Sequence, residues 1–531
     1  MPAEKNKKSN YQTLTAPLKK GATNSHDQPT LKFSGSRTKE NLPAGKLVEP
    51  HKKAANEIPP ETILEEIKSV PAENILAAAI SSPPAEEIPF AQQTKRKKKE
   101  KKAEKDRDLL NNEKWLTRNG HTLTYIGLYL FSILVFFRPY ELVSGLSFLS
   151  TSAFIFALAT LAVYLPTQLS TEGSLTMFST EVKCVLALTL IALVTMPIAK
   201  DPPLAWTTFN ETFIKAVVMF IVMVNVLRTR RRLMGLIWLS LAVGIYLSYT
   251  AVDLYMKGEF KVEGYRVGVE VAGLFGNPND MALHLVTMTP IAVALGFGSR
   301  RKLMRVVYFM MAGLFIAANM VTFSRGGFLG LIAVGAVLAW KLGRGNRFNI
   351  SLASMVVSGA FILFAPGNYG LRILSIFIPS LDPVGSNGQR REILERSIIV
   401  TLRNPWGIGI GNFPIVGFNN LVSHNAFTQV SSELGVLGLL VYLIFMISPF
   451  RKLGAIERTL FDKNERNWFY YMAIGLQASI VGYMTSSFFV SVAYNWFVYY
   501  LIGYAVAFRR IYKIEKGIEE SEKDVFGLPT V

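Results

Sequence analysis

The chain has 531 residues, half of them hydrophobic and only 18% charged, yet its formal net charge is +19. A soluble domain has about a quarter charged residues, and here the basic residues lie in short clusters between apolar segments. This pattern predicts a polytopic membrane protein and argues against a nucleic-acid partner. The single cysteine, Cys184, excludes an intrachain disulfide and a cysteine metal cluster.

Residues 1–118 are rich in Lys, Glu, Pro, Ser and Asn and poor in aromatic residues. Such a segment buries too little apolar surface to offset the entropy of ordering, so we predict a disordered, basic cytoplasmic tail without a cleavable signal peptide. A short amphipathic helix at "PETILEEIKSVPAENILAAAI" is the alternative for that stretch. The run "KRKKKEKKAEKDRD" fixes the orientation of the first span or contacts anionic lipid headgroups.

From residue 119 to 510, apolar runs alternate with short polar loops. A membrane span needs about 20 mostly apolar residues, and the sequence therefore predicts an all-α, polytopic membrane domain of about twelve transmembrane helices. A cytoplasmic C-terminal tail follows at 511–531. The predicted spans are roughly 121–138, 147–166, 182–199, 209–227, 233–255, 279–297, 306–323, 327–341, 350–365, 424–449, 468–487 and 489–508.

Lysine and arginine near the ends of spans indicate the topology. With the N-terminus inside, the even-numbered connections hold "RTRRR", "SRRKLMR", "KLGRGNR" and "RKLGAIER", and the C-terminal "RRIYKIEK" is also inside. Both termini are therefore predicted to be cytoplasmic. The largest outside loop, about 366–423 between spans nine and ten, contains "NGQRREILERSIIVTLRNP", whose apolar residues follow helical spacing and predict an amphipathic surface helix.

Arginines on the outer face run against the charge bias and need a reason. Arg266 lies in "EGYRVGVEVAGLFGNPND", Arg325 in "TFSRGGFLG", and Arg390 opens the helix of the large loop. Guanidinium groups that converge near one surface suit a diphosphate, because each can grip two oxygens. The alternative is a local pair with a carboxylate. We favour that alternative for the other arginines of the loop helix, which have glutamates beside them, and a functional role for Arg325.

His424 stands where the large loop enters span ten, next to Asn425. A lone histidine is more often structural, but its unperturbed pKa of about 6.5 suits a general base, and Asn425 could orient the ring or a sugar. Glu433 lies roughly 13 Å deeper and half a turn away, which favours an interhelical contact. The glycines of "GIGIG" (407–411) follow no strand of a βαβ unit, so they predict a tight turn rather than a phosphate loop. No metal motif is present, and we predict no metal and no cofactor.

Four stretches together resemble the O-antigen ligase and polymerase family of bacterial membrane proteins: "GLFGNPNDMALHL", "TFSRGGFLGL", "QRREILERSIIVTLRNPWGIGIGNF" and "SHNAFTQVSSELGVLGLL". The resemblance covers roughly residues 200–450. It implies a metal-independent glycosyltransferase of the bacterial inner membrane that uses a polyprenyl-diphosphate-linked glycan on the periplasmic side. The implied acceptor is a glycan, a lipid A-core sugar or a protein hydroxyl. The resemblance implies His424 as the catalytic base, Asn425 in support, and Arg325, Arg390 and Arg266 on the diphosphate.

Two other classes stay open. A membrane transporter of a small anion or of a lipid-linked glycan would also use arginines, although the internal repeats and paired broken spans typical of transporters are not evident. A scaffold of a surface-polysaccharide complex would use the basic tail as a docking arm. If Arg325, Arg390 and His424 meet in one outward-facing pocket, the enzyme is favoured.

Overall fold

The computed structural model describes residues 115–137, 152–260, 262–269, 275–344, 348, 352, 369 and 386–517. All of them belong to one compact unit, Pro89–Val531. The helix proposed within 60–80, the basic run 95–108 and the ninth predicted span lie outside the described residues.

The described residues form helices joined by short loops, with one isolated β-bridge between Val262 and Arg266. In these ranges the chain forms no β-strand, so the prediction of an all-α fold is confirmed there. The helices are α4 (Trp115–Phe136), α6 (Ser152–Glu172), α7 (Thr180–Thr195), α8 (Pro202–Thr208), the π-helix η3 (Phe209–Phe213), α9 (Ile214–Val226), α10 (Arg230–Met256), α11 (Pro278–Gly298), α12 (Lys302–Val321), α13 (Arg325–Leu342), α16 (Ser386–Arg403), α17 (Phe413–Val416), the 3-10 helix η5 (Phe418–Asn420), α18 (Ala426–Glu433), α19 (Gly435–Asp462), α20 (Trp468–Ser487) and α21 (Trp496–Lys516).

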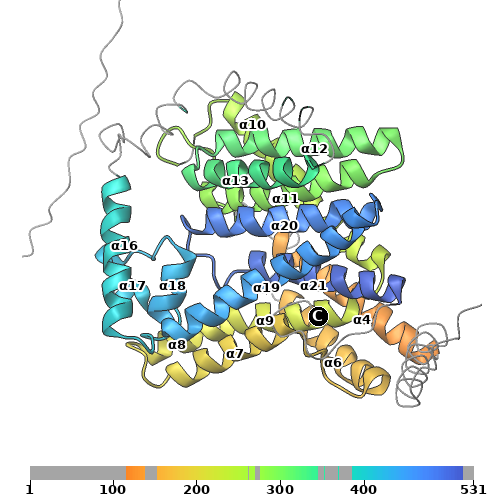
Figure 1. Ribbon diagram of the computed structural model, residues 1–531. Coiled ribbons are helices and arrows are strands. Elements are labelled where there is room, and N and C mark those ends of the chain that lie inside the picture. The colour runs from red at the N-terminus through yellow and green to blue at the C-terminus, as the bar shows by residue number, and fades with distance from the viewer. Residues whose placement is uncertain are drawn as a thin grey trace, which may run out of the picture. The chain divides into compact units, whose positions relative to one another are not determined.

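The long helices run side by side from one end of the bundle to the other (Figure 1). α11 packs against α12 and α20, and α20 also contacts α13, α19 and α21. Residues of α11, α20 and α21 are buried along almost their whole length. Their tyrosines bond across helices, as in the 2.7 Å contact between the hydroxyls of Ser240 and Tyr504. The centre of the bundle is therefore enclosed by protein, and α4, α6 and α7 lie at its periphery.

Among the described residues, seven helical segments are long and apolar enough to cross a membrane. They confirm a multi-pass membrane fold, whereas twelve spans stay a prediction. α7 has 16 residues and reaches only about 24 Å. α20 includes tyrosine, serine and glutamine residues, and α21 includes four tyrosines and a charged C-terminal half. The seven segments are Ala153–Glu172, Pro202–Val226, Arg230–Met256, Pro278–Gly298, Lys302–Val321, Arg325–Leu342 and Gly435–Asp462.

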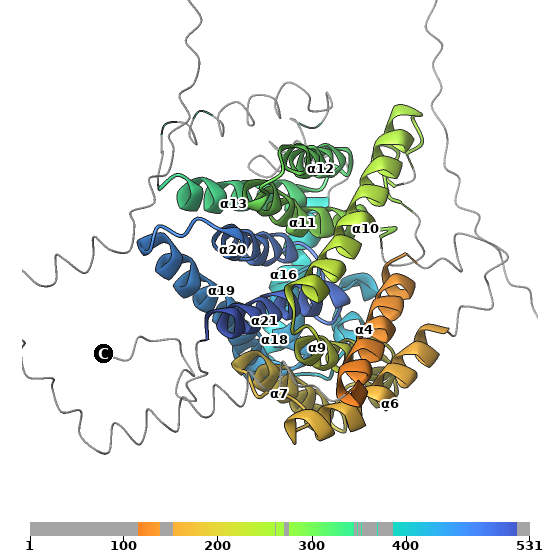
Figure 2. The ribbon, with the colours of Figure 1, turned by 90° about the vertical axis from the view of Figure 1, so that its right-hand side faces the viewer.

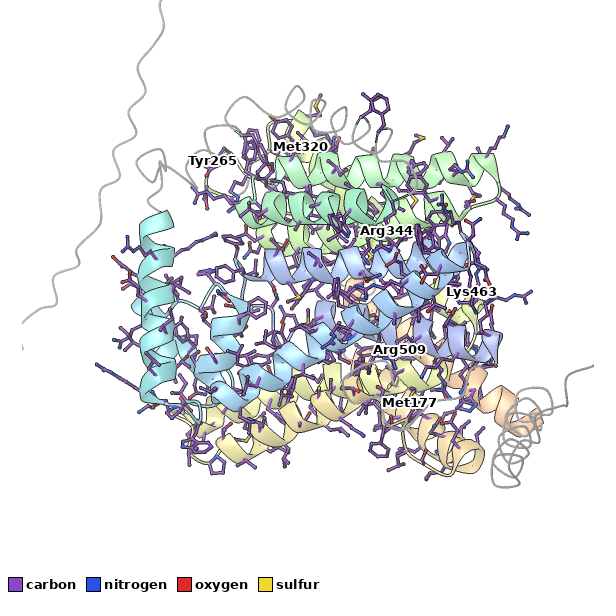
Figure 3. The ribbon with its side chains drawn as sticks, in the orientation of Figure 1. Met177, Tyr265, Met320, Arg344, Lys463 and Arg509 are labelled. Atoms are coloured by element: carbon purple, nitrogen blue, oxygen red, sulfur yellow. The ribbon has the colours of Figure 1, made fainter. Side chains whose placement is uncertain are left out.

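The two ends of the bundle differ in charge. Figure 3 places Arg344 and Lys463 at the end opposite α16, and Tyr265 at the α16 end. At the basic end, the buried carboxylate of Glu457 accepts hydrogen bonds of 2.7 Å from both Lys341 and Arg344. A buried carboxylate needs cationic partners, and these two contacts join the C-terminal end of α13 to α19.

α16 lies across the ends of the long helices (Figure 1). Ile393, Ser397 and Val400 form its buried face at helical spacing, while Ile398 and Leu402 are exposed. The helix predicted in the large loop is therefore confirmed, and it lies against α18.

Span ten is not continuous, which corrects the prediction of one helix over 424–449. α18 ends at Glu433, Leu434 has φ −108° and ψ 4°, and α19 begins at Gly435 with φ +76°. The apolar segment long enough to cross a membrane begins at Gly435. His424 therefore lies before a separate short helix, not at the entrance of the span.

Candidate functional site at the α16 end

His424 is held in place by the start of α18. Asn425 caps this helix, because its Oδ1 accepts hydrogen bonds from the backbone N–H groups of Phe427 (2.8 Å) and Thr428 (3.2 Å). The Ser423 hydroxyl lies 2.6 Å from the hydroxyl of Thr428. His424 itself has φ +50°, in the left-handed region that residues with a β-carbon rarely adopt. Such conformations cluster at functional sites, where the surrounding structure enforces them.

α16 brings Arg390 close to His424. Burial lowers the pKa of His424 below its usual value, and the positive charge of Arg390 lowers it further. The two segments also touch through the hydroxyls of Ser397 and Ser423, which are 3.4 Å apart. Both effects favour the neutral imidazole, the state that a general base requires.

Arg266 lies buried in the loop before α11, and three groups fix its guanidinium. Nε donates to the carbonyl of Thr322 (3.0 Å), Nη1 pairs with Glu263 (3.2 Å), and Nη2 donates to Oδ1 of Asn279 (2.8 Å). Burial lowers the pKa of Arg266, Glu263 opposes this effect, and the charge of Arg325 adds to it. Arg266 and Arg325 are therefore neighbours.

Arg325 is the first residue of α13 and is buried. Ser324 caps α13 by accepting from the N–H of Gly327 (3.2 Å), and its hydroxyl donates to Oδ1 of Asn279 (2.9 Å). The same amide oxygen thus holds both Arg266 and the residue before Arg325. Two neighbouring guanidinium groups repel each other, and a bound anion would relieve that repulsion.

The predicted site residues form two pairs, and Figure 3 shows Tyr265, the residue before Arg266, at the end of the bundle where α16 lies. One pair is Arg266 with Arg325, and the other is Arg390 with His424. Between α13 and α16 the structure describes residues 343, 344, 348, 352 and 369. The ring of Tyr369 packs with its centre 5.5 Å from that of Phe323, two residues before Arg325. A single pocket that joins both pairs stays a prediction.

The glycine-rich stretch before α17 forms a tight turn, as the sequence predicted. Gly407, Gly409 and Gly411 have φ values of +92°, +95° and +74°. The turn packs against the break between α18 and α19, since a β-carbon on Gly435 would lie 2.3 Å from the carbonyl oxygen of Pro405. The turn therefore sets the position of α18, which begins one residue after Asn425.

The polar face of α18 contacts the link between α20 and α21, which the sequence did not reveal. Gln429 Oε1 accepts from the N–H of Ala493 (3.3 Å), and Glu433 Oε1 accepts from the N–H of Phe413 (3.2 Å). Tyr494 lies beside the Glu433 carboxyl. Glu433 is thus an interhelical contact, as predicted, although the predicted depth and rotation assumed a continuous helix from His424 that the structure does not have.

The fold and these two clusters define a multi-pass helical membrane protein with histidine and arginine residues gathered at one end. A model of the O-antigen ligase family matches residues 309–443, from α12 into α19. Over these residues the chain is similar to the O-antigen ligase family, which points to a glycosyltransferase-like enzyme of surface polysaccharide biosynthesis. The matched segment includes Arg325, Arg390 and His424, and Arg266 precedes it. A search of curated proteins found no match to the chain.

Proposed function

We propose that the protein transfers a glycan from a polyprenyl-diphosphate carrier to an acceptor hydroxyl at the periplasmic face of the bacterial inner membrane. The observation that carries this proposal is the overlap of the O-antigen ligase match with the site: Arg325, Arg390 and His424 all lie within 309–443. The acceptor is a glycan, a lipid A-core sugar or a protein. The basic connections at the opposite end support a cytoplasmic location for both termini.

In this reaction the neutral imidazole of His424 takes the proton of the acceptor hydroxyl. The hydroxyl oxygen attacks the anomeric carbon while the bond from that carbon to the diphosphate oxygen breaks. The diphosphate leaves with the electron pair, and His424 holds the proton as imidazolium. A single displacement of this kind inverts the anomeric carbon and needs neither metal nor nucleotide.

The arginines stabilise the negative charge that builds on the departing diphosphate. Arg390 has a second effect, because its charge disfavours the protonated form of His424. Arg266 and Arg325 supply the other guanidinium groups, and three hydrogen bonds hold that of Arg266 in position before the substrate binds. Asn425 uses its Oδ1 to cap α18, and its buried Nδ2 has no hydrogen-bond partner among the described residues. That N–H group is a donor for a sugar oxygen.

The test is the glycan profile of a deletion strain rescued with wild type, His424→Ala or His424→Asn. Asparagine tolerates the left-handed φ of this position better than alanine, so His424→Asn removes the base with the least backbone strain. We expect both variants to reach the membrane at normal levels without restoring transfer. Normal glycan chains with His424→Asn would exclude His424 as the base. Loss of chain length would indicate a polymerase, and loss of attachment a ligase.

An activity assay with the purified protein distinguishes an enzyme from a transporter. In detergent, where no compartments exist, an enzyme still converts a lipid-linked glycan and an acceptor to product, whereas a transporter does not. Product formed by wild type and absent with His424→Asn is the expected result.

A further inference from the structure

The segment that links α20 to α21, residues 488–495, has a fixed course inside the bundle. Val492 and Ala493 are buried, and buried backbone groups need hydrogen-bond partners. The carbonyl of Val492 accepts from the Tyr483 hydroxyl (3.3 Å), and that of Ala493 accepts from the Tyr499 hydroxyl (3.3 Å). This α20–α21 link is therefore anchored by both of the helices that it joins.

The start of the α20–α21 link lies against the first turn of α13. α20 itself lies between α13 and the layer formed by α19 and α21 (Figures 1 and 2). Ser486, in the last turn of α20, donates its hydroxyl to the carbonyl of Gly326 (3.0 Å). A β-carbon on Gly326 would lie 2.9 Å from the β-carbon of Phe489. Because Gly326 directly follows Arg325, these contacts fix the backbone beside that arginine.

The end of the α20–α21 link holds α18. The N–H of Ala493 donates to Oε1 of Gln429 (3.3 Å). Gln429 lies in α18, the helix that begins two residues after His424. The turn at 405–411 contacts the other end of α18, at the break before α19, so Gln429 provides a separate connection between this helix and the interior of the bundle. The link thus bridges the helix that begins at Arg325 and the helix that follows His424.

We infer that Gln429 is a positioning residue, which through the α20–α21 link holds His424 at a fixed distance from Arg325. The inference rests on the glycan transfer proposed above, in which His424 takes the acceptor proton and Arg325 stabilises the departing diphosphate. In a single displacement the acceptor and the leaving group lie on opposite sides of the anomeric carbon, so the separation of these two residues has to match the reacting atoms. A misplacement of about 1 Å lowers a rate by up to about 100-fold. Gln429 acts on the reaction only through the positions of His424 and Arg325.

Distances between spin labels test this bridge without an assay of transfer. Val422→Cys, in the segment before α18, and Ile332→Cys, in α13, carry the labels, because both positions are exposed. The only native cysteine, Cys184, is buried. We expect one narrow distance distribution in the full chain that carries only the labels. Gln429→Leu removes the acceptor for the N–H of Ala493, and the distribution should then broaden.

Two further variants separate positioning from a general loss of structure. Gln429→Glu keeps an acceptor oxygen at the same place along the side chain, and it should restore the narrow distribution. Gln477→Leu makes the same change at a buried position of α20, where the amide donates within its own helix to the carbonyl of Ala473 (3.1 Å). This matched control should show the same distances as the chain that carries only the labels.

Steady-state kinetics of glycan transfer by the purified, unlabelled chain give the second readout. Gln429→Leu should lower kcat about 10- to 100-fold, because the base is no longer held in place. The KM for the lipid-linked glycan should stay close to that of wild type, since the loss falls on the transition state rather than on binding. Gln429→Glu should recover most of the lost kcat, and Gln477→Leu should retain it.

Three results would overturn the inference. One is a distance distribution in Gln429→Leu as narrow as that of the chain that carries only the labels, in which case the turn at 405–411 positions α18 without the link. The second is an equal loss of kcat in Gln477→Leu, and the third is a raised KM with unchanged kcat in Gln429→Leu. A wild-type protein without transfer activity would refute the proposed function alone, and the distances would still decide whether Gln429 holds α18 to α13.

Discussion

Replacing Gly435 with alanine tests whether the turn before α17 holds the break between α18 and α19. The new β-carbon would lie 2.3 Å from the carbonyl oxygen of Pro405 and 2.6 Å from the carbonyl carbon of Trp406, at φ +76°. Both contacts are with main-chain atoms, which cannot rotate away as a side chain does. The left-handed φ costs about 1–2 kcal/mol for alanine, and overpacking adds about 1–3 kcal/mol. The free energy of unfolding should fall by about 2–5 kcal/mol.

Thermal unfolding of the purified chain in detergent measures this loss. Gly335→Ala is the matched control, because a β-carbon there meets no atom within 4 Å and Gly335 lies inside α13. Alanine in a helix is favoured over glycine by about 0.5–1 kcal/mol, so this control should melt at or above the wild-type temperature. If Gly435→Ala melts with wild type, the turn does not hold the break, and the account of how α18 is positioned is wrong.

Gly407, which faces Gly435 across this contact, provides a second test of it. A β-carbon on Gly407 would lie 2.4 Å from the carbonyl oxygen of Glu433 and 2.7 Å from the backbone nitrogen of Gly435. Gly407→Ala should therefore destabilise as well. Both changes separate the same pair of segments. The free energy of unfolding of the double variant should therefore fall by less than the sum of the losses in the two single variants.

Three further outcomes follow from the site and the basic end. Burial and Arg390 both lower the pKa of His424, so the acid limb of the pH–rate profile for glycan transfer should lie below the usual titration range of histidine. Arg390→Gln removes one cause and should move this limb to higher pH, whereas an unmoved limb would separate the two residues. Asn425→Ala removes the cap of α18 and should cost about 1 kcal/mol in a melting experiment, with Asn425→Ser close to wild type. Glu457→Ala leaves the buried Lys341 without its carboxylate and should cost about 3–5 kcal/mol, and a variant as stable as wild type would show that the pair is hydrated.

Local sequence was sufficient for most of the helices. A run of apolar residues needs little more than its own length to predict a membrane helix, and α10, α11 and α12 begin and end close to the predicted positions. The amphipathic spacing within α16 could also be seen in the sequence of that helix alone. The break at Leu434 could not be predicted from the local sequence, because the apolar run continues through it. The break packs against the turn at 405–411, which lies more than twenty residues earlier in the chain, and this contact could be found only in three dimensions.

In the candidate site, too, some features could be predicted from the local sequence and others only from the structure. His424 and Arg325 could be chosen from their type and position alone, but the sequence did not show which residues are neighbours. Arg266 and Arg325 lie 59 positions apart, and Asn279 connects them from a third segment. Asn279 lies in a stretch quoted above for the family resemblance, but nothing in the sequence linked it to either arginine. Tyr494 had no signal at all, since one tyrosine near a span end is common.

The contacts of Arg266 explain how its positive charge is tolerated in the protein before a substrate binds. A guanidinium group has five N–H donors, and the described contacts engage Nε once, Nη1 once and Nη2 once. Glu263 offsets its charge, so Arg266 is stable in the empty protein and still has N–H groups to offer. Arg325 lies beside it, and its charge is felt at Arg266 as repulsion. A diphosphate that bound both would therefore gain attraction from each arginine and remove the repulsion between them. In the proposed reaction this pair is thus the stronger anchor for the leaving group, and Arg390 acts chiefly on His424.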